Sequence, residues 1–169
     1  MNISVVLAMH GVPPKEFPRS EMMELLLLHQ RLESAGGPER QALEKRHDEI
    51  EQKMRSWPRT PENDPFFASS QKIAKALCEI LGVEVFVGFN EFCAPSIEEA
   101  VAQAASKSPR KVIVITPMMT GGGAHSEKDI PRAVGNAKKK YPHIEIIYAW
   151  PYDVSEVAHF LAKQVKHFI

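Results

Sequence analysis

Two histidines and one glutamate stand at positions where they could bind a metal. His10 directly follows one short apolar run of the chain, Glu91 follows a second, and His125 lies in the loop after a third. Two imidazoles and one carboxylate suit a borderline divalent ion such as cobalt, iron, nickel or zinc. A neutral imidazole can also accept a proton at physiological pH. These three residues are therefore the candidate metal ligands and the candidate catalytic proton acceptors.

His10 and Glu91 also have plainer interpretations. A histidine at the end of a buried strand often packs in the core with a hydrogen bond to the backbone, and Glu91 could be a solvated loop carboxylate. The remaining five histidines fall on expected helix faces or loop ends, so we expect surface or packing roles for them. They are His29, His47, His143, His159 and His167.

The apolar runs predict the strands of a parallel sheet. They are short and almost continuous, as in strands covered on both faces, and they span residues 3–9, 83–89, 111–116 and 144–150. Helical patterns alternate with them. The expected helices are 66–81, stopped by Gly82; one starting at Ser96 with a capping box to Glu99; 127–140 with Ser126 as N-cap; and one from Val154 to the end. This alternation predicts a doubly wound α/β sandwich with helices on both faces.

The expected strand order of the sandwich is 2-1-3-4. Ligands of such sheets bind beyond the carboxyl ends of the strands, where the strand order reverses. Strands one and three flank that point and strand two is their neighbour. We therefore expect His10, Glu91 and His125 to converge on one rim of a four-stranded sheet.

Residues 13–64 interrupt the alternation and predict a helical hairpin inserted after strand one. Gly36, Gly37 and Pro38 separate a helix around 25–28 from a charge-rich helix at 39–55. The second helix carries Leu43, Ile50 and Met54 on one side, and Pro58, Pro61 and Pro65 form a stiff connector. The hairpin is either a solvated decoration or a flap over a ligand or a partner helix. We therefore predict a single domain, 1–169, with this insertion.

Composition excludes several classes of protein. Lys plus Arg and Asp plus Glu both number 21, so no overall field favours nucleic acid or anionic lipid. Cys78 and Cys93 lack metal-ligand spacing, which fits a reducing cytoplasm. The first residues look like a strand rather than a signal peptide, and no apolar run reaches the roughly 20 residues of a membrane span. We expect a cytoplasmic protein without a membrane or nucleic-acid partner.

The glycine run at 121–123 does not predict a nucleotide site. A phosphate-binding Walker loop ends in Gly-Lys-Ser/Thr, whereas this one continues Ala124-His125-Ser126. The dinucleotide fingerprint is also missing after strand one, where Gly11 is followed by Val12 and two prolines. No nucleotide cofactor is therefore expected, and the run is either a flexible crossover loop or a place of close approach to a flat ligand.

Three segments resemble the short sirohydrochlorin cobaltochelatase family, relatives of the ferrochelatases within the ATP-independent class II chelatases. They are His10-Gly11 after the first strand, Gly88-Phe89-Asn90-Glu91-Phe92-Cys93-Ala94-Pro95-Ser96, and the most specific, Pro117 to Pro131 with its Gly, His and Asp-Ile-Pro. The resemblance covers residues 1–12 and about 66–165. It implies a chelatase-type α/β fold, with His10 and His125 at the metal-binding and proton-accepting positions and Glu91 at the acidic position.

The resemblance also implies a substrate and an assembly. The expected reaction is insertion of Co²⁺, or less favoured Fe²⁺ or Ni²⁺, into sirohydrochlorin or a related tetrapyrrole of cobalamin or sirohaem biosynthesis. Long family members hold two such halves around one cleft, so this chain implies a homodimer. Basic side chains should meet the macrocycle carboxylates, with Lys15, Arg19, Lys128 and Arg132 as candidates.

The chain departs from the family pattern at the rim that would face the macrocycle. Val12-Pro13-Pro14 follows His-Gly where a serine and a basic residue are usual, three glycines precede His125, and the 13–64 insertion is long. A non-catalytic metal or tetrapyrrole carrier of the same fold is therefore the alternative hypothesis. A flavodoxin-like nucleotide-binding or regulatory domain is a third, which rests on fold analogy alone.

Overall fold

A four-stranded parallel sheet forms the centre of the molecule. The computed structural model describes residues 2–169, apart from the side chain of Glu33. The strands are β1 (Ile3–Met9), β2 (Val85–Phe89), β3 (Lys111–Ile115) and β4 (Glu145–Tyr148), in the order β2-β1-β3-β4. The register places Leu7 of β1 between Val87 and Ile115. The predicted fold class and strand order are confirmed.

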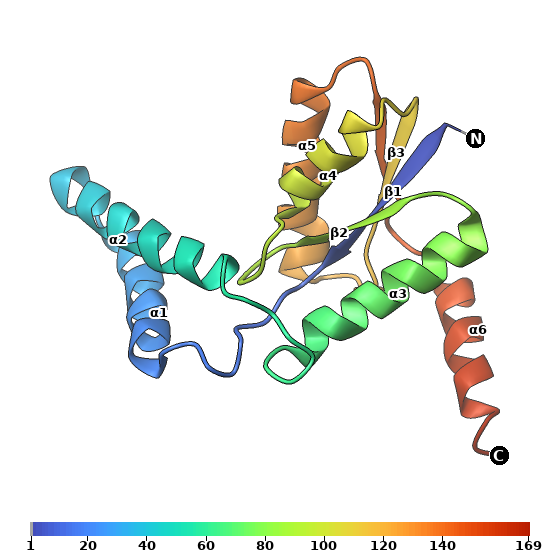
Figure 1. Cartoon of the computed structure of the whole chain (residues 1–169), viewed down its shortest axis with the longest axis horizontal. Coiled ribbons are helices and arrows are strands. Elements are labelled where there is room, and N and C mark those ends of the chain that lie inside the picture. The colour runs from blue at the N-terminus through green and yellow to red at the C-terminus, as the bar shows by residue number, and fades with distance from the viewer. Residues whose placement is uncertain (1) are drawn as a thin grey trace.

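Helices cover both faces of this sheet, as predicted (Figure 1). On one face α4 (Ile97–Ser106) and α5 (Ile130–Lys140) pack on alternate strand residues such as Val6, Val112 and Val114. On the other face α3 (Pro65–Leu81) packs on Leu7, Met9 and Phe89. Because side chains alternate along a strand, the apolar runs supply both cores at once.

Local capping explains where two of these helices begin and end. The Asp64 side chain caps α3 by accepting a hydrogen bond from the Phe67 amide (2.8 Å), and Gly82 ends that helix in the left-handed conformation. The predicted capping box of Ser96 and Glu99 is present at α4. The stop at Gly82 and the capping box at Ser96 were predicted from the sequence and are confirmed, whereas the Asp64 cap was not predicted.

The start of the next helix differs from the prediction. Ser126 is not an N-cap; it is buried within a π-helical turn, η1 (His125–Asp129), that runs directly into α5. Pro131 sits in the first turn of α5 and has no amide hydrogen for the α-helical bond to residue 127, which accounts for the wider turn. His125 is consequently on a helical turn rather than in a loop.

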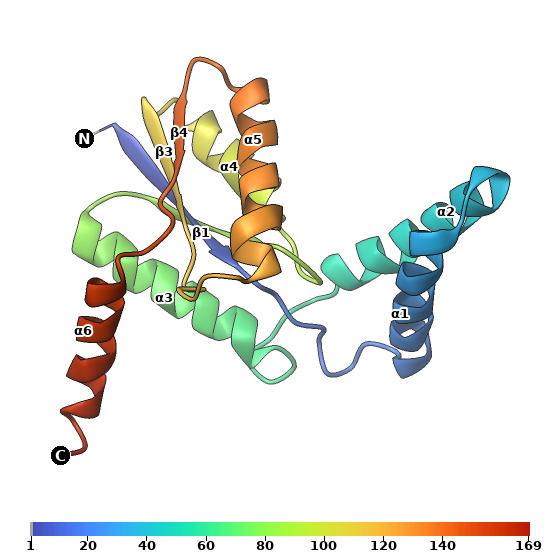
Figure 2. The ribbon, with the colours of Figure 1, turned by 180° about the vertical axis from the view of Figure 1, so that it is seen from behind.

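The insertion is a pair of helices that projects away from the sheet (Figure 2). It consists of α1 (Arg19–Ser34) and α2 (Gly37–Arg55), as the sequence predicted. The hairpin has its own apolar cluster, in which Leu43, Ile50 and Met54 are buried as expected. This cluster is distinct from the two cores of the sheet, and Phe92 of the loop after β2 packs against it.

The last helix, α6 (Val154–Val165), stands apart from the body of the molecule (Figures 1 and 2). None of its residues is buried, although its apolar residues include Phe160 and Leu161. The α3 face of the sheet is also incompletely covered at β3 and β4, where Ile113 is half-buried and Ile147 is exposed. In the described residues no helix is long and apolar enough to cross a membrane.

Candidate metal centre

The fold brings the three predicted residues together at the carboxyl edge of the sheet. His10 follows β1, Glu91 follows β2, and His125 opens the turn after β3. One potential ligand atom from each lies within 4.8 Å of those from the other two. The imidazole rings of His10 and His125 are nearly perpendicular, with centroids 4.6 Å apart, and Nε2 of His125 lies 3.6 Å from a Glu91 carboxylate oxygen. All three side chains are partly exposed, so an ion or ligand can reach them.

The orientation of His10 leaves one ring nitrogen available. Its Nδ1 lies 2.5 Å from the carbonyl oxygen of Gly11, to which a protonated Nδ1 donates a hydrogen bond. The neutral ring then carries its lone pair on Nε2, which is the form that binds a metal or accepts a proton. The backbone contact therefore selects the useful tautomer of His10.

His125 is held by two residues that sequence reasoning did not select. Its Nδ1 lies 2.9 Å from a carboxylate oxygen of Asp129 and 2.6 Å from the side-chain nitrogen of Asn90. A protonated Nδ1 donates to Asp129, and an unprotonated Nδ1 accepts from Asn90. With the proton on Nδ1, Nε2 faces Glu91 as a free ligand atom, and a carboxylate behind a ligating histidine raises its basicity.

Gly11 allows the His10 and Glu91 segments to approach each other. The Glu91 amide donates a hydrogen bond to the His10 carbonyl at 2.9 Å. A Cβ atom on Gly11 would lie 1.9 Å from the Glu91 carbonyl oxygen, and the φ of Gly11 is +96°, a value that favours glycine. Gly11 therefore sets the spacing between two of the candidate ligands.

Two arginines at the base of the hairpin hold the loop that carries Glu91. Arg55 donates to the carbonyls of Asn90 (2.9 Å) and Cys93 (3.0 Å). Arg59 donates to the Phe92 carbonyl and forms a buried ion pair with Asp64 at 2.6 Å. The insertion thus supports the candidate site from its base.

Cys93 lies in the same loop but is not a ligand candidate. Its side chain is 1% exposed, and burial raises the pKa of the thiol to about 11. With this pKa the Cys93 thiol stays protonated near neutral pH. Metals bind the thiolate, so Cys93 is not a ligand at that pH.

The basic residues proposed from sequence occupy different places. Arg132 forms an ion pair with Asp129 at 2.8 Å, and Lys128 lies exposed in η1, so both are close to His125 in the chain. Lys15 donates to the Glu62 carbonyl in the connector, and Arg19 opens α1. In the glycine run, the Gly122 amide donates to the Glu127 carboxylate at 2.6 Å.

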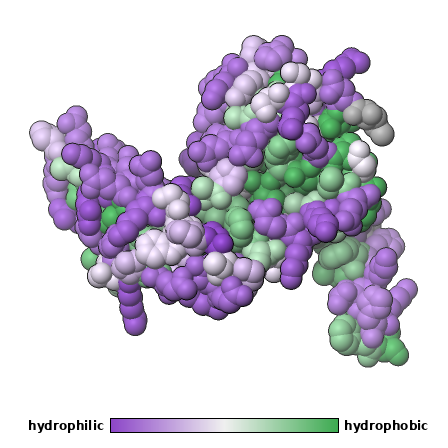
Figure 3. Space-filling view, in the orientation of Figure 1, coloured by the Kyte–Doolittle hydropathy of each residue, from purple (hydrophilic) through white to green (hydrophobic). Residues whose placement is uncertain are grey.

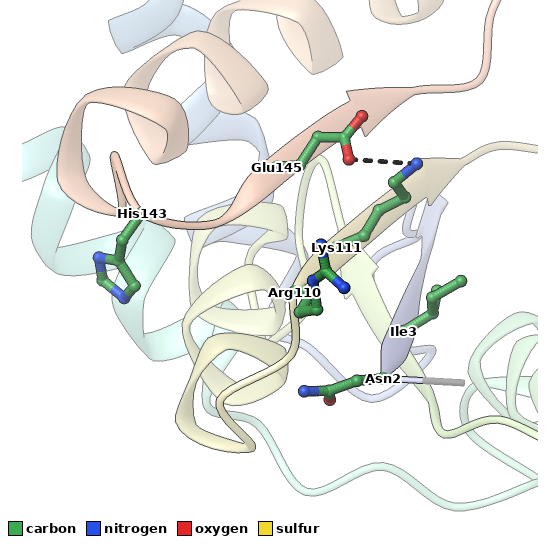
Figure 4. Close-up of a pocket in the computed structure, with 6 residues that line it drawn as sticks. All are labelled: Asn2, Ile3, Arg110, Lys111, His143 and Glu145. Carbon is green, nitrogen blue, oxygen red and sulfur yellow. Dashed lines mark ion pairs between the residues drawn. The ribbon is translucent and has the colours of Figure 1, made fainter.

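A separate hollow of about 590 Å³ lies at the opposite end of the sheet (Figure 4). It is lined by residues at the amino ends of β1, β3 and β4, including Arg110, His143 and an ion pair between Lys111 and Glu145 at 3.1 Å. It contains none of the candidate ligands, and ligands of open α/β sheets bind at the other edge.

Fold and site together define an α/β protein of the chelatase type. The sequence model of the CbiX family matches residues 65–167, more than half of the chain. The chain belongs to the CbiX family, which confirms the resemblance seen in the sequence.

Curated relatives match only part of the chain. A sirohydrochlorin cobaltochelatase of Priestia megaterium is 37% identical over 70 residues, which are 41% of this chain and 22% of that protein. A sirohydrochlorin cobaltochelatase of Methanopyrus kandleri is 39% identical over 66 residues, which are 38% of this chain and 46% of that protein. The matched segments therefore span less than half the length of either relative.

A solved structure has the same fold over nearly the whole chain. A CbiX protein from Marinobacter aquaeolei VT8 superposes with a TM-score of 0.55 at 13% sequence identity, covering 98% of this chain and 95% of that one.

Proposed function

We propose that this protein is an ATP-independent chelatase that inserts a divalent metal, with Co²⁺ favoured, into sirohydrochlorin or a related tetrapyrrole. The observation that carries the proposal is the perpendicular pair His10 and His125, with Glu91 beside them, on the edge of a CbiX-family fold. The names of the curated relatives support the metal and the macrocycle. The whole chain would act as one domain, with 13–64 as its inserted hairpin and connector.

The reaction needs two kinds of group, and this edge holds both. The macrocycle must lose two pyrrolic protons while the metal exchanges its ligands for four nitrogens. Nε2 of His10 and of His125 would bind the incoming ion and then accept protons once the ion has left them. Glu91 would orient His125 or pass protons to solvent, and Asp129 would hold the Nδ1 proton of His125.

We further propose that the protein is a homodimer in the cytoplasm. The two free cysteines fit a reducing compartment. No residue of α6 is buried against the described part of the chain, and β3 and β4 are incompletely covered on the α3 face. In a two-fold dimer, each α6 can cover the open sheet face of the other chain, so one contact buries both surfaces. Figure 3 shows hydrophobic surface both beside α3 and at the end of the chain.

The test is metal insertion followed by the absorbance of the macrocycle. Wild type should convert sirohydrochlorin in the presence of Co²⁺ without ATP, and His10→Ala and His125→Ala should each lower the rate by at least tenfold. His143→Ala, at the opposite end of the sheet, serves as the histidine control. Undiminished turnover in both site variants would remove the mechanism. Tight metal binding without insertion into several macrocycles would favour the carrier function.

A further inference from the structure

A second group of metal-ligating side chains lies on the inserted hairpin. His47, Asp48 and Glu51 of α2 place one potential ligand atom each within 4.8 Å of the others. The sequence predicted a surface or packing role for His47, and it did not select Asp48 or Glu51. They are separate from the His10, Glu91 and His125 centre.

The spacing on the helix explains the arrangement. His47 and Glu51 are four residues apart and share a helix face. Nδ1 of His47 lies 3.8 Å from Oε2 of Glu51 and 3.3 Å from Oδ1 of Asp48. Ligand atoms around an ion at about 2.1 Å are about 3.0 to 3.4 Å apart, so the cluster needs only small side-chain rotations to close on one.

The second helix of the hairpin adds another imidazole. The ring of His29, on α1, has its centroid 6.0 Å from that of His47. Two histidines on facing helices with a carboxylate one turn away suit the same borderline divalent ions as the first centre. An ion bound here would join α1 to α2.

Charge also favours a cation at this place. Within the described part of the hairpin, carboxylates such as Glu21, Glu24 and Glu39 pair with Lys or Arg. Asp48 instead faces the His47 ring, with Oδ1 3.3 Å from Nδ1. Glu51 uses Oε1 for Arg55 at 2.9 Å, which fixes the carboxylate and leaves Oε2 facing His47. The cluster therefore has an uncompensated negative charge beside a largely buried imidazole, 18% exposed.

We propose that His47, Asp48 and Glu51, with His29 completing the set, form a second binding site for a divalent transition metal. Arg55, which anchors Glu51, also donates to the carbonyls of the loop that carries Glu91. His47 lies two helical turns from Arg55, roughly 12 Å along the axis. Any use of this ion at the first centre rests on the proposed chelatase function, whereas binding itself does not.

The test counts bound Co²⁺ by equilibrium dialysis, a measurement that requires no turnover. Wild type should bind two ions per chain, the double variant His10→Ala/His125→Ala one, and the double variant His47→Ala/Glu51→Gln one. The combination of all four substitutions should bind none, and His143→Ala should still bind two. Circular dichroism checks that each variant retains its helices.

The d–d absorption of Co²⁺ gives an independent reading in the His10→Ala/His125→Ala protein. Bands from histidine-bound Co²⁺ should be present there and should disappear with His47→Ala/Glu51→Gln, and His29→Ala should weaken binding about tenfold. If the combined variant binds as much Co²⁺ as His10→Ala/His125→Ala, the hairpin site does not exist. An inactive chelatase that still binds Co²⁺ on the hairpin would contradict only the proposed function.

Discussion

The side chains behind the ligands decide how well the candidate centre can bind metal. Asp129 lies one helical turn after His125 and accepts from its Nδ1, so it helps to present Nε2 toward Glu91. Partners of this kind typically change metal affinity by 10- to 100-fold when they are removed.

Asp129→Asn should therefore weaken Co²⁺ binding at the first centre by about 10- to 100-fold, because the amide no longer stabilises the positive charge that develops on the ligating ring. The measurement is a Co²⁺ titration in the His47→Ala/Glu51→Gln background. Glu98→Gln, in the first turn of α4, is the control and should leave the affinity unchanged. Equal affinities for the two variants would contradict the role of Asp129.

Cys93 predicts a pH dependence of stability. Burial raises the pKa of its thiol from 9.0 to about 11 in the folded protein. Between these values the unfolded chain binds fewer protons than the folded one, so the free energy of unfolding should fall as the pH rises, by about 3 kcal/mol in total. Below pH 9 this contribution is fully present.

Denaturant unfolding of wild type and Cys93→Ala between pH 8 and 11 measures this contribution. The variant should be less stable at pH 8 and should lose less stability with rising pH. Cys78→Ala, at a half-buried position, should keep the wild-type slope. Parallel slopes for wild type and Cys93→Ala would overturn the assignment.

At this scale the sequence indicated the candidate ligands but not the residues that hold them. His10, Glu91 and His125 were recognisable because each follows a predicted strand. Asp129 follows His125 by four residues, but the sequence predicts a loop at His125, where a four-residue spacing does not bring side chains together. Arg55 and Arg59 donate mainly to backbone carbonyls, which every residue offers, so no residue pattern reveals these contacts.

At the scale of the elements, the end of β1 and the loop after β2 can meet at the rim because their backbones approach closely at Gly11. Gly11 lets the end of β1 contact the Glu91 segment, and no other residue type fits there without moving that segment. The strands could be predicted because both faces are apolar. The π-helical turn η1 could not be predicted. The sequence predicts a helix that starts at residue 127, and the wider turn arises because Pro131 has no amide hydrogen.

Gly11→Ala should lower the free energy of unfolding by at least about 2 kcal/mol, through the clash with the Glu91 carbonyl and the positive φ. Co²⁺ affinity at the first centre should fall with it, because Glu91 must move. Gly135→Ala is the matched control in α5: its Cβ meets nothing within 4 Å, so it should stabilise the protein by roughly 0.5 to 1 kcal/mol. Wild-type stability and affinity for Gly11→Ala would contradict this account.

The whole molecule leaves apolar surface on α6 without cover from its own chain. A helix of 12 residues with an apolar face and no buried residue gains little from its own sheet. The sequence predicted the start of this helix at Val154 correctly, but the helix ends at Val165 rather than at the end of the chain. Its docking could not be predicted, because periodicity identifies an apolar face and says nothing of which chain covers it.

Leu161→Ser should shift the proposed dimer toward monomer, which sedimentation velocity over a range of concentrations would detect. Leu27→Ser on the hairpin is the matched control, since Leu161 is 55% and Leu27 56% exposed within one chain. Equal sedimentation of both variants and wild type would exclude α6 from the interface. A monomeric wild type would exclude the dimer itself.

The separate apolar cluster of the hairpin has a consequence for how the molecule opens. Because α1 and α2 bury Leu25, Leu28 and Ile50 among themselves, the pair can unfold locally while the sheet stays intact. Amide hydrogens of α2 should therefore exchange with deuterium sooner than those of β1. A metal bound between the two helices would slow that exchange. The exchange rate of α2 would therefore report whether the hairpin site holds an ion.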